Sequence, residues 1–279
     1  MKKLLLSIIL VLSLCSISLA QPVTGTFEVL QFDKMKLHIF TTTQGPGDVS
    51  YVFETSDSLV LFELPSINHL SRQLKDYVDN LNKPVQAILV GYHVGGASYY
   101  PNVPIYASKY AINFIDSGEE MKVRKAIAAT TADFDLNVIK PDNIVAPGKQ
   151  TIAGIDFIFI EPTTSPIPGM NVVIPAIDAY YQHVLGGSSH PILLSMEHID
   201  KVIAELKNQQ QANYALMLDS HNGLEKPSAI TKKIAYLEKL KNIRQSSSNQ
   251  EEFVNAVKSA FPDYKGERAL ISTAKNLYR

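Results

Sequence analysis

Histidines at the ends of apolar segments are the residues of this chain that could do chemistry. His93 follows the apolar run 85–90 and precedes a glycine pair at 95 and 96, so a strand would deliver its side chain to a loop. His183 and His221 also stand where an apolar run gives way to turn residues. A neutral imidazole at such a place can ligate a metal ion, or it can hydrogen-bond loop backbone and hold a turn. The residue types alone leave both roles open for all three.

The segment VQAILVGYHVGG, residues 85–96, resembles the signature of the metallo-β-lactamase superfamily, a strand that ends in H-x-H-x-D-H-x-x-G. When the two are aligned on HVGGA, His93 takes the place of the last signature histidine and Tyr92 that of the aspartate. Ile88 and Val90 take the places of the first two histidines. The segment therefore keeps one of the four ligand positions.

Three later turns can be compared with the ligand-bearing turns of the same family. The turn 162–166, PTTSP, has hydroxyls where the family has a ligand histidine. The strand AYYQHVLGG places His183 and Val184 where a glycine and a bridging aspartate normally stand. The turn SHNG is similar to the late Gly-His-Gly of the family, so His221 takes a ligand position. A dinuclear site of this family uses about six ligand positions, and only His93 and His221 match.

The resemblance implies an α/β fold of the α+β kind, a four-layer αββα sandwich of metallo-β-lactamase type. It also implies a degenerate metal site without β-lactamase activity, because apolar residues hold most ligand positions and make a cleft floor that is stable without metal. Our leading hypothesis is a secreted protein that binds a small molecule or a protein partner. Its expected pocket is lined by Tyr92, Tyr99, Tyr181 and Asp219.

The competing hypothesis is a mononuclear zinc-dependent hydrolase. In the family, the positions of His93 and His221 serve the same metal, so His183 would complete three imidazoles around a single Zn²⁺ with one position open for water. Asp219, Tyr92 or Ser188 would then support the ligands. A third hypothesis is an interaction protein whose cleft holds neither metal nor ligand.

Strand alternation bears on the direction of His183. Neighbouring residues of a strand point to opposite faces, so His183 reaches the other ligands only if its strand breaks near the following glycines or carries a bulge. His190 lies close enough in sequence to join the cluster, but it matches no position of the family. His38, His69 and His198 fall on ordinary strand or helix faces, and we expect them at the surface.

Hydrophobic periodicity predicts the elements that must position these residues. Strands are expected over 27–32, 36–43, 49–55 and 59–64, then a helix capped by Ser66 and the strand 85–90. A short strand at 103–107 and one or two helices within 110–131 follow. A second strand series is expected from Asn143, over 150–153, 155–161, 170–174 and 179–185, and then a helix around 196–206 and a strand at 214–218. The segment 226–279 is expected to be helical, with Ser248 and Glu251 forming a capping box.

The N-terminus has the form of a secretory signal peptide. A basic start, an apolar run over 4–14 and a small-x-small site at 18–20 predict cleavage near Ala20-Gln21 and a protein outside the cytoplasm. Residues 21–279 would then form a single domain. Cys15, the only cysteine, lies inside the signal, so we expect no disulfides. A lipoprotein would need a small residue before Cys15, where the chain has Leu14.

Composition excludes some classes of partner. The chain has 46% hydrophobic residues, enough to fill a large core, and a formal net charge of −1. Without a basic stripe, neither nucleic acid nor an anionic membrane surface is expected as a partner. No stretch after the signal is long and apolar enough to span a bilayer.

Overall fold

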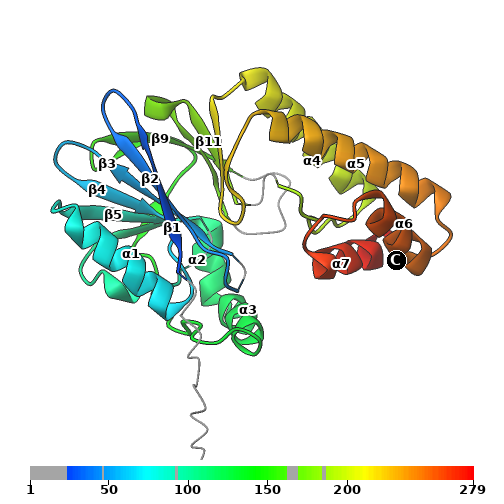
Figure 1. The fold of residues 1–279 in the computed structure, drawn as a ribbon, viewed down its shortest axis with the longest axis horizontal. Coiled ribbons are helices and arrows are strands. Elements are labelled where there is room, and N and C mark those ends of the chain that lie inside the picture. Colours follow the sequence, from blue (N-terminus) through cyan, green and yellow to red (C-terminus); the bar gives the residue numbers. More distant parts are fainter. Residues whose placement is uncertain (1–23, 46, 92–93, 162–168, 184–186) are drawn as a thin grey trace, which may run out of the picture.

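Two β-sheets form the centre of the molecule (Figure 1). This computed structural model describes residues 24–45, 47–91, 94–161, 169–183 and 187–279. The first sheet has the order β1-β2-β3-β4-β5-β6-β7 and the second the order β13-β12-β11-β10-β9-β8.

The first sheet comprises β1 (Thr26–Gln31), β2 (Lys36–Thr41), β3 (Val49–Glu54), β4 (Leu59–Phe62), β5 (Val85–Val90), β6 (Ile105–Ser108) and β7 (Asn143–Val145). The second comprises β8 (Gly148–Ile152), β9 (Ile155–Ile160), β10 (Asn171–Ile174), β11 (Ala179–Gln182), β12 (Leu216–Asp219) and β13 (Gly223–Glu225). The helices are α1 (Asn68–Asn80), α2 (Lys109–Asp116), α3 (Glu119–Ala128), α4 (Met196–Ala212), α5 (Ser228–Ser246), α6 (Gln250–Ala260) and α7 (Glu267–Leu277). Two short 3₁₀ turns, η1 (Ala97–Tyr99) and η2 (Pro175–Ile177), complete the described elements.

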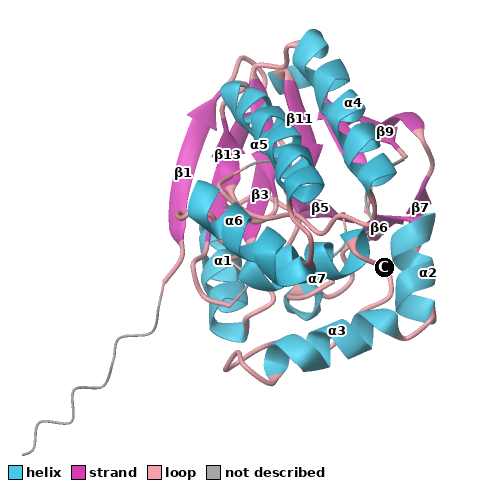
Figure 2. Cartoon of the chain, turned by 90° about the vertical axis from the view of Figure 1, so that its right-hand side faces the viewer, coloured by secondary structure: helices cyan, strands magenta, loops and turns pink. Residues whose placement is uncertain are grey.

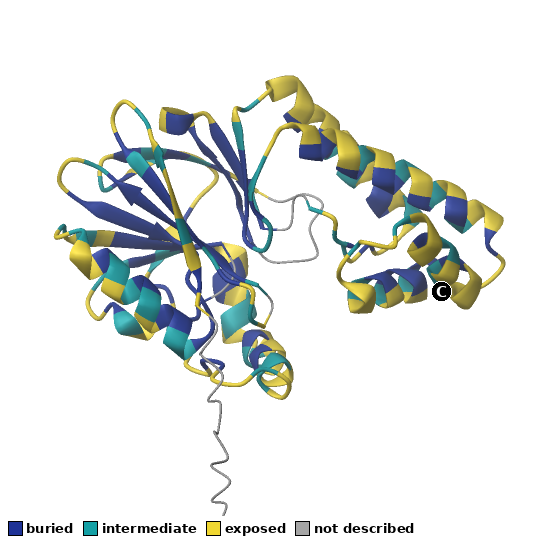
Figure 3. Cartoon of the chain, viewed as in Figure 1, coloured by how far each residue is buried: buried dark blue, intermediate teal, exposed yellow. Residues whose placement is uncertain are grey.

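Helices cover the outer faces of the two sheets, which gives four layers (Figures 1 and 3). Three hydrophobic cores lie between these layers. Between the sheets, aromatic residues such as Phe53 and Phe157 meet at 5.7 Å between ring centroids. The other face of the first sheet packs on α1, through residues such as Leu70 and Leu74. The outer face of the second sheet packs on α4 to α7. The predicted αββα sandwich is therefore confirmed (Figure 2).

Most predicted strands are present within two or three residues of their expected bounds, and the structure corrects three details. The strand at Asn143 does not open the second sheet, because β7 pairs in parallel with β6 in the first. Ser66 does not cap α1, which begins at Asn68; the Ser66 backbone N–H donates to the Asp48 carboxylate instead. The cap of α6 is Asn249, one residue later than predicted, and its side chain accepts from the backbone N–H of Glu252.

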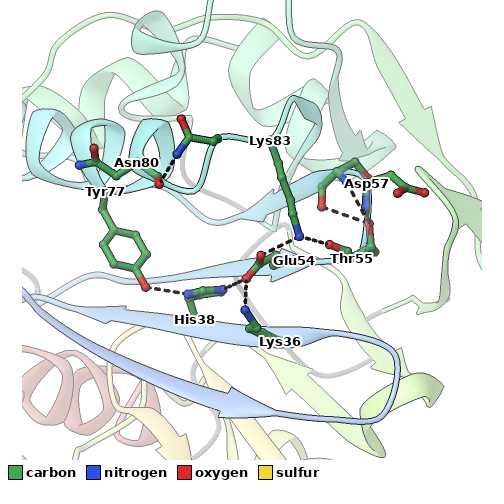
Figure 4. A network of polar contacts seen from close by, with 10 residues as sticks. Lys36, His38, Glu54, Thr55, Asp57, Tyr77, Asn80 and Lys83 are labelled. Atoms are coloured by element: carbon green, nitrogen blue, oxygen red, sulfur yellow. Dashed lines mark hydrogen bonds and ion pairs between the residues drawn. The ribbon is translucent and has the colours of Figure 1, made fainter.

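His38 and His198 were expected at the surface and are instead buried, with 3% and 8% of their area exposed. His38 lies in β2 between two partners: its Nε2 is 2.8 Å from a Glu54 carboxylate oxygen and its Nδ1 is 2.7 Å from the Tyr77 hydroxyl of α1 (Figure 4). Lys83 donates to the other Glu54 oxygen at 2.7 Å. Such pairing makes the burial of these polar groups tolerable.

Candidate functional site

The candidate site lies where two pairs of parallel strands end. β4 runs parallel to β5 in the first sheet, and β11 runs parallel to β12 in the second. Glu63 and Gly91 follow the first pair, and His183 and Ser220 follow the second. The hydroxyl of Tyr181 in β11 bonds to Glu63 at 2.8 Å, so the ends of the two pairs meet.

His183 and His221 face one another in this region. Their Nε2 atoms are 3.3 Å apart, and the ring planes stand at 86°. The ring of His221 is 22% exposed, whereas His183 is buried. On the opposite side of its ring, His221 Nδ1 lies 3.2 Å from the carbonyl oxygen of Gly47 and 4.0 Å from a carboxylate oxygen of Asp48.

Strand register brings the two histidines together. Gln182, the last residue of β11, is paired with Asp219, the last residue of β12. Each histidine follows shortly after its strand, and the backbone N–H of Ser220 donates to the carbonyl of His183 at 3.2 Å. The expectation that the strand continues to residue 185 is wrong, because β11 ends at Gln182. The alternation that opposed His183 as a partner of His221 therefore does not apply.

Asp219 holds the turn that carries His221. One of its carboxylate oxygens accepts the backbone N–H groups of His221 at 2.7 Å and Asn222 at 2.9 Å. Its own backbone exchanges hydrogen bonds with the buried Tyr51 hydroxyl from the first sheet. Asp219 is fully buried, so it positions the backbone of His221 and does not line an open pocket.

Glu63 is the centre of a second polar cluster. One carboxylate oxygen accepts the backbone N–H of Gly91 at 2.7 Å and the hydroxyl of Tyr181 at 2.8 Å. The Tyr181 hydroxyl also lies 2.5 Å from the hydroxyl of Ser220. Burial, with the nearby Glu63 carboxylate, raises the pKa of Tyr181 well above its usual range, so Tyr181 stays a neutral donor.

Two backbone features make this cluster possible. Glu63 has φ of 56°, in the left-handed region that few residues with side chains adopt. A Cβ atom on Gly91 would lie 2.3 Å from the Glu63 carboxylate and 2.8 Å from the Tyr181 hydroxyl, so any other residue would displace these groups. We infer that local strain at Glu63 and the absence of a side chain at Gly91 serve the same contact.

The predicted site residues are placed in different ways. Tyr92 and His93 lie outside the described residues. Tyr181 is fully buried between the sheets and so does not line a pocket surface. Tyr99 contacts α1, where its hydroxyl bonds to Asn68 at 3.1 Å and to Arg72 at 3.3 Å.

His190 does not join the pair of histidines. Its Nδ1 lies 2.8 Å from the Tyr236 hydroxyl of α5, and its ring lies among the aromatic residues of the C-terminal helices.

Sequence reasoning missed two acidic residues that support the site. Asp48 is buried beside His221, and burial raises its pKa although His221 and hydrogen bonds from Ser66 oppose this effect. Asp135 accepts the backbone N–H of Gly96 in the signature segment at 3.1 Å. The turn Gly-Pro-Gly-Asp before β3 was a visible signal for Asp48, but no local pattern points to Asp135.

The donor set can be tested against a metal ion. Among the described residues, no group of three histidine, cysteine or acidic side chains is arranged to hold one. Two imidazole nitrogens nevertheless converge, and two nitrogens that share a tetrahedral zinc at about 2.0 to 2.1 Å lie about 3.3 Å apart. The pair lies within hydrogen-bonding distance and also fits two of the ligand positions of a zinc ion, and the described residues supply no third ligand.

Comparisons with known proteins identify the fold of the chain. No protein-family model and no curated protein sequence matches the chain. Among solved structures, a metallo-β-lactamase from Pontibacter korlensis is 15% identical, with a TM-score of 0.57 over 76% of this chain and 99% of that one. The metallo-β-lactamase IND-7 is 17% identical, with a TM-score of 0.57 over 76% and 98%.

A larger enzyme is also similar. The sec-alkylsulfatase Pisa1 from Pseudomonas sp. is 13% identical, with a TM-score of 0.61 over 86% of this chain. The match spans 46% of that enzyme, about half its length. The chain has the metallo-β-lactamase fold, and the resemblance seen in the sequence is confirmed at the level of the fold.

Proposed function

We propose that this protein is a hydrolase of the metallo-β-lactamase fold that uses a single zinc ion, held by His183 and His221 with His93 as the third ligand. The observation that supports the proposal is the 3.3 Å separation of the two Nε2 atoms, which matches neighbouring ligands of one tetrahedral ion. His93 is included because of its position in the signature segment of the sequence.

The surroundings of His221 favour ligation over a purely structural role. A hydrogen bond from Nδ1–H to the Gly47 carbonyl would fix the tautomer in which Nε2 carries a lone pair. Asp219 fixes the turn from the backbone side. His221 thus resembles a ligand whose orientation is set before any ion arrives.

A zinc ion bound here would supply a Lewis acid and lower the pKa of a coordinated water to about 7. The residues of the chain have the other tasks. His183 and His221 would hold the ion, and Asp219 would hold the turn that carries His221. Most positions of a second metal ion are lost, so we expect no β-lactamase activity.

Metal analysis tests the proposal directly. Protein purified without added zinc should contain about one equivalent, and His183→Ala and His221→Ala should each abolish it. His69→Ala is the matched control, because that histidine lies at the surface of α1 and pairs with Asp133. Wild-type protein that binds no zinc when dialysed against it, or variants that keep their metal, would reject the proposal.

A second candidate is a metal-free protein that binds a small molecule or a partner. The Glu63 cluster favours it, because hydrogen bonds from an amide and a hydroxyl of the chain itself stabilise this buried carboxylate. The two candidates differ in thermal stability: chelation lowers the melting temperature of a zinc protein and leaves that of the second candidate unchanged.

We also propose that the chain is exported and cleaved near Gln21. In the part of the chain that the structure describes, no helix is long and apolar enough to cross a membrane. N-terminal sequencing of protein from the extracytoplasmic fraction should start near Gln21, and an intact Met1 in that fraction would contradict the proposal.

A further inference from the structure

A cavity of about 380 Å³ lies where the C-terminal helices meet the segments that follow both histidines. Gly187 and Ser188 come shortly after His183, and the end of β13 comes shortly after His221. The N-terminal half of α5 and the connection between α6 and α7 form its other walls. Two of its walls thus come from the segments that follow the two histidines in sequence.

Backbone hydrogen bonds fix the wall formed by the connection between α6 and α7. The N–H of Lys265 donates to the carbonyl of Ser188 at 2.8 Å, and the N–H of His190 donates to the carbonyl of Lys265 at 2.9 Å. The ring of Tyr264, which lines the cavity, stacks on Tyr236 at 4.9 Å between centroids. The aromatic wall is therefore held in place without a ligand.

The charges around the cavity are mostly positive. Lys226 and Lys232 line it, and neither forms an ion pair with any described residue. Lys233 lies buried behind them, over the Tyr236 and Tyr264 rings, and donates to the Ser189 carbonyl at 2.8 Å.

One carboxylate opposes these lysines. Glu225 lines the cavity and accepts a hydrogen bond from the backbone of Gly187. Burial, and then the charge of Asp219, raises the pKa of Glu225, while Lys232 and Lys233 lower it. Because Lys226 and Lys232 line the cavity with only this one carboxylate among the described residues, the lining keeps a net positive charge that favours an anion.

The remaining lining is suited to a small apolar body. Leu224 and Ala229 face the cavity together with the ring of Tyr264, and Ser228 adds a hydroxyl. A volume of a few hundred Å³ with an apolar wall and a few polar groups is typical of small-molecule sites.

We propose that this cavity binds a small amphiphilic acid, whose oxyanion group lies on Lys226 and Lys232 and whose apolar part lies on Tyr264. That such an acid is the substrate class of the zinc site rests on the proposed function. That the cavity binds the acid does not rest on it.

Calorimetric titration of the full chain tests binding at pH 7.5, after chelation of metal so that no ion can bind the probe. Benzoate and phenyl phosphate serve as probes, and benzyl alcohol is the neutral analogue. We expect at least one of the two anions to bind at least tenfold more tightly than benzyl alcohol, and the better one to identify the oxyanion.

Paired variants assign the site. The double variant Lys226→Gln/Lys232→Gln should weaken anion binding at least tenfold. Lys207→Gln/Lys239→Gln removes the same charge from exposed positions of α4 and α5 outside the cavity, and should leave binding unchanged. The proposal would be overturned if the anions and benzyl alcohol bound equally tightly, or if no saturable binding were seen. It would also be overturned if Lys226→Gln/Lys232→Gln bound the anion as tightly as the wild type.

A further variant separates this proposal from the zinc site. His221→Ala should keep the lysine-dependent binding of the anion, because His221 does not line the cavity. If the wild type binds the anion but no zinc, the proposed function fails and the cavity assignment stands. If it binds zinc but not the anion, the cavity assignment fails and the proposed function stands.

Discussion

At the scale of single residues, the site depends on side chains that hold backbone rather than on side chains that face solvent. Asp219, Glu63 and Asp135 each accept N–H groups from a loop that follows a strand. A carboxylate that accepts several backbone bonds fixes a turn more firmly than water can, because the bonds are charge-assisted. Substitutions at these residues should therefore change the geometry of the site before they change its chemistry.

Tyr181→Phe should lower the free energy of unfolding by about 1 to 3 kcal/mol, because it leaves the buried Glu63 carboxylate without one of its donors. Urea unfolding at pH 7 measures the loss. Tyr110→Phe is the control, since that ring is 45% exposed on α2. Equal stability of Tyr181→Phe and the control would show that the hydroxyl carries no net stabilisation.

The His38 and Glu54 pair should make the fold sensitive to acid (Figure 4). Burial alone would raise the pKa of Glu54, but hydrogen bonds from Lys83, His38 and Lys36 outweigh it and lower the pKa to about 2. Burial lowers the pKa of His38, although Glu54 opposes this. In both cases the pKa is lower in the folded protein, so the unfolded chain binds more protons. Each group therefore stabilises the fold above its pKa in the unfolded chain, and this stabilisation is lost as the pH falls towards its pKa in the folded protein.

We expect the free energy of unfolding to fall in two ranges, below about pH 6.5 from His38 and from about pH 4.5 towards pH 2 from Glu54. Glu54→Gln should remove the lower range, on the order of 1 to 2 kcal/mol after screening by solvent. Urea unfolding at a series of pH values measures both. A variant with the same acid dependence as the wild type would show that other carboxylates are responsible.

At the scale of elements, most strands and helices could be predicted, but several of their ends could not. The run Val85 to Val90 became β5 with its predicted bounds, because both its apolar composition and its flanking residues were local signals. β11 ended early because its last partner is Asp219 of a strand far along the chain, which no local pattern reveals. β13 has three residues and is too short to give a periodic signal.

The same reason separates the parts of the site that were predicted from those that were not. Histidines at the ends of strands were visible, and so His183 and His221 were proposed. Contacts such as the one from Tyr51 to Asp219 cross 168 residues and depend on how the sheets face one another. Likewise, the burial of Tyr181 follows from the face of β11 that the second sheet turns inward.

Helix α3 carries a buried ion pair that allows a prediction at this scale. Arg124 and Glu120 are 2% and 1% exposed, and Arg124 also donates to the backbone carbonyl of Asp135. Arg124→Leu should destabilise the protein by about 3 to 5 kcal/mol, because it leaves the buried Glu120 carboxylate without its positively charged partner.

The double variant Arg124→Leu/Glu120→Leu should recover part of that loss, since the Glu120 carboxylate is no longer buried without its partner. The recovery should be incomplete, because Arg124 also lies 4.0 Å from the buried Asp135 carboxylate. Urea unfolding of the two single variants and the double variant gives the coupling. Strictly additive losses would mean that each residue acts through other contacts.

At the scale of the whole molecule, the C-terminal helices share a core with the second sheet. Val173, Tyr180 and Met217 of the sheet belong to the same cluster as Phe253 and Leu270 of α6 and α7. A shared core couples the stability of its parts. We therefore expect a single unfolding transition for sandwich and helices together.

Phe253→Ala tests this coupling. Phe253 is fully buried, so the substitution should cost about 3 to 5 kcal/mol and lower the melting temperature of the whole protein by about 10 °C. Scanning calorimetry measures it, with Ile271→Ala, at a residue that is 50% exposed, as the control. Two transitions, of which only one moves, would show that the helices unfold independently.

The backbone ladder between residues 188–190 and Lys265 has a consequence for how this chain can diverge. Main-chain hydrogen bonds do not depend on side-chain identity, so point changes at these positions can accumulate without moving the segment that follows His183. A gain or loss of one residue between Pro262 and Gly266 would instead shift the register of the ladder. Descendants of the chain would therefore have to keep the length of this connection, together with the Tyr264 ring that stacks on Tyr236.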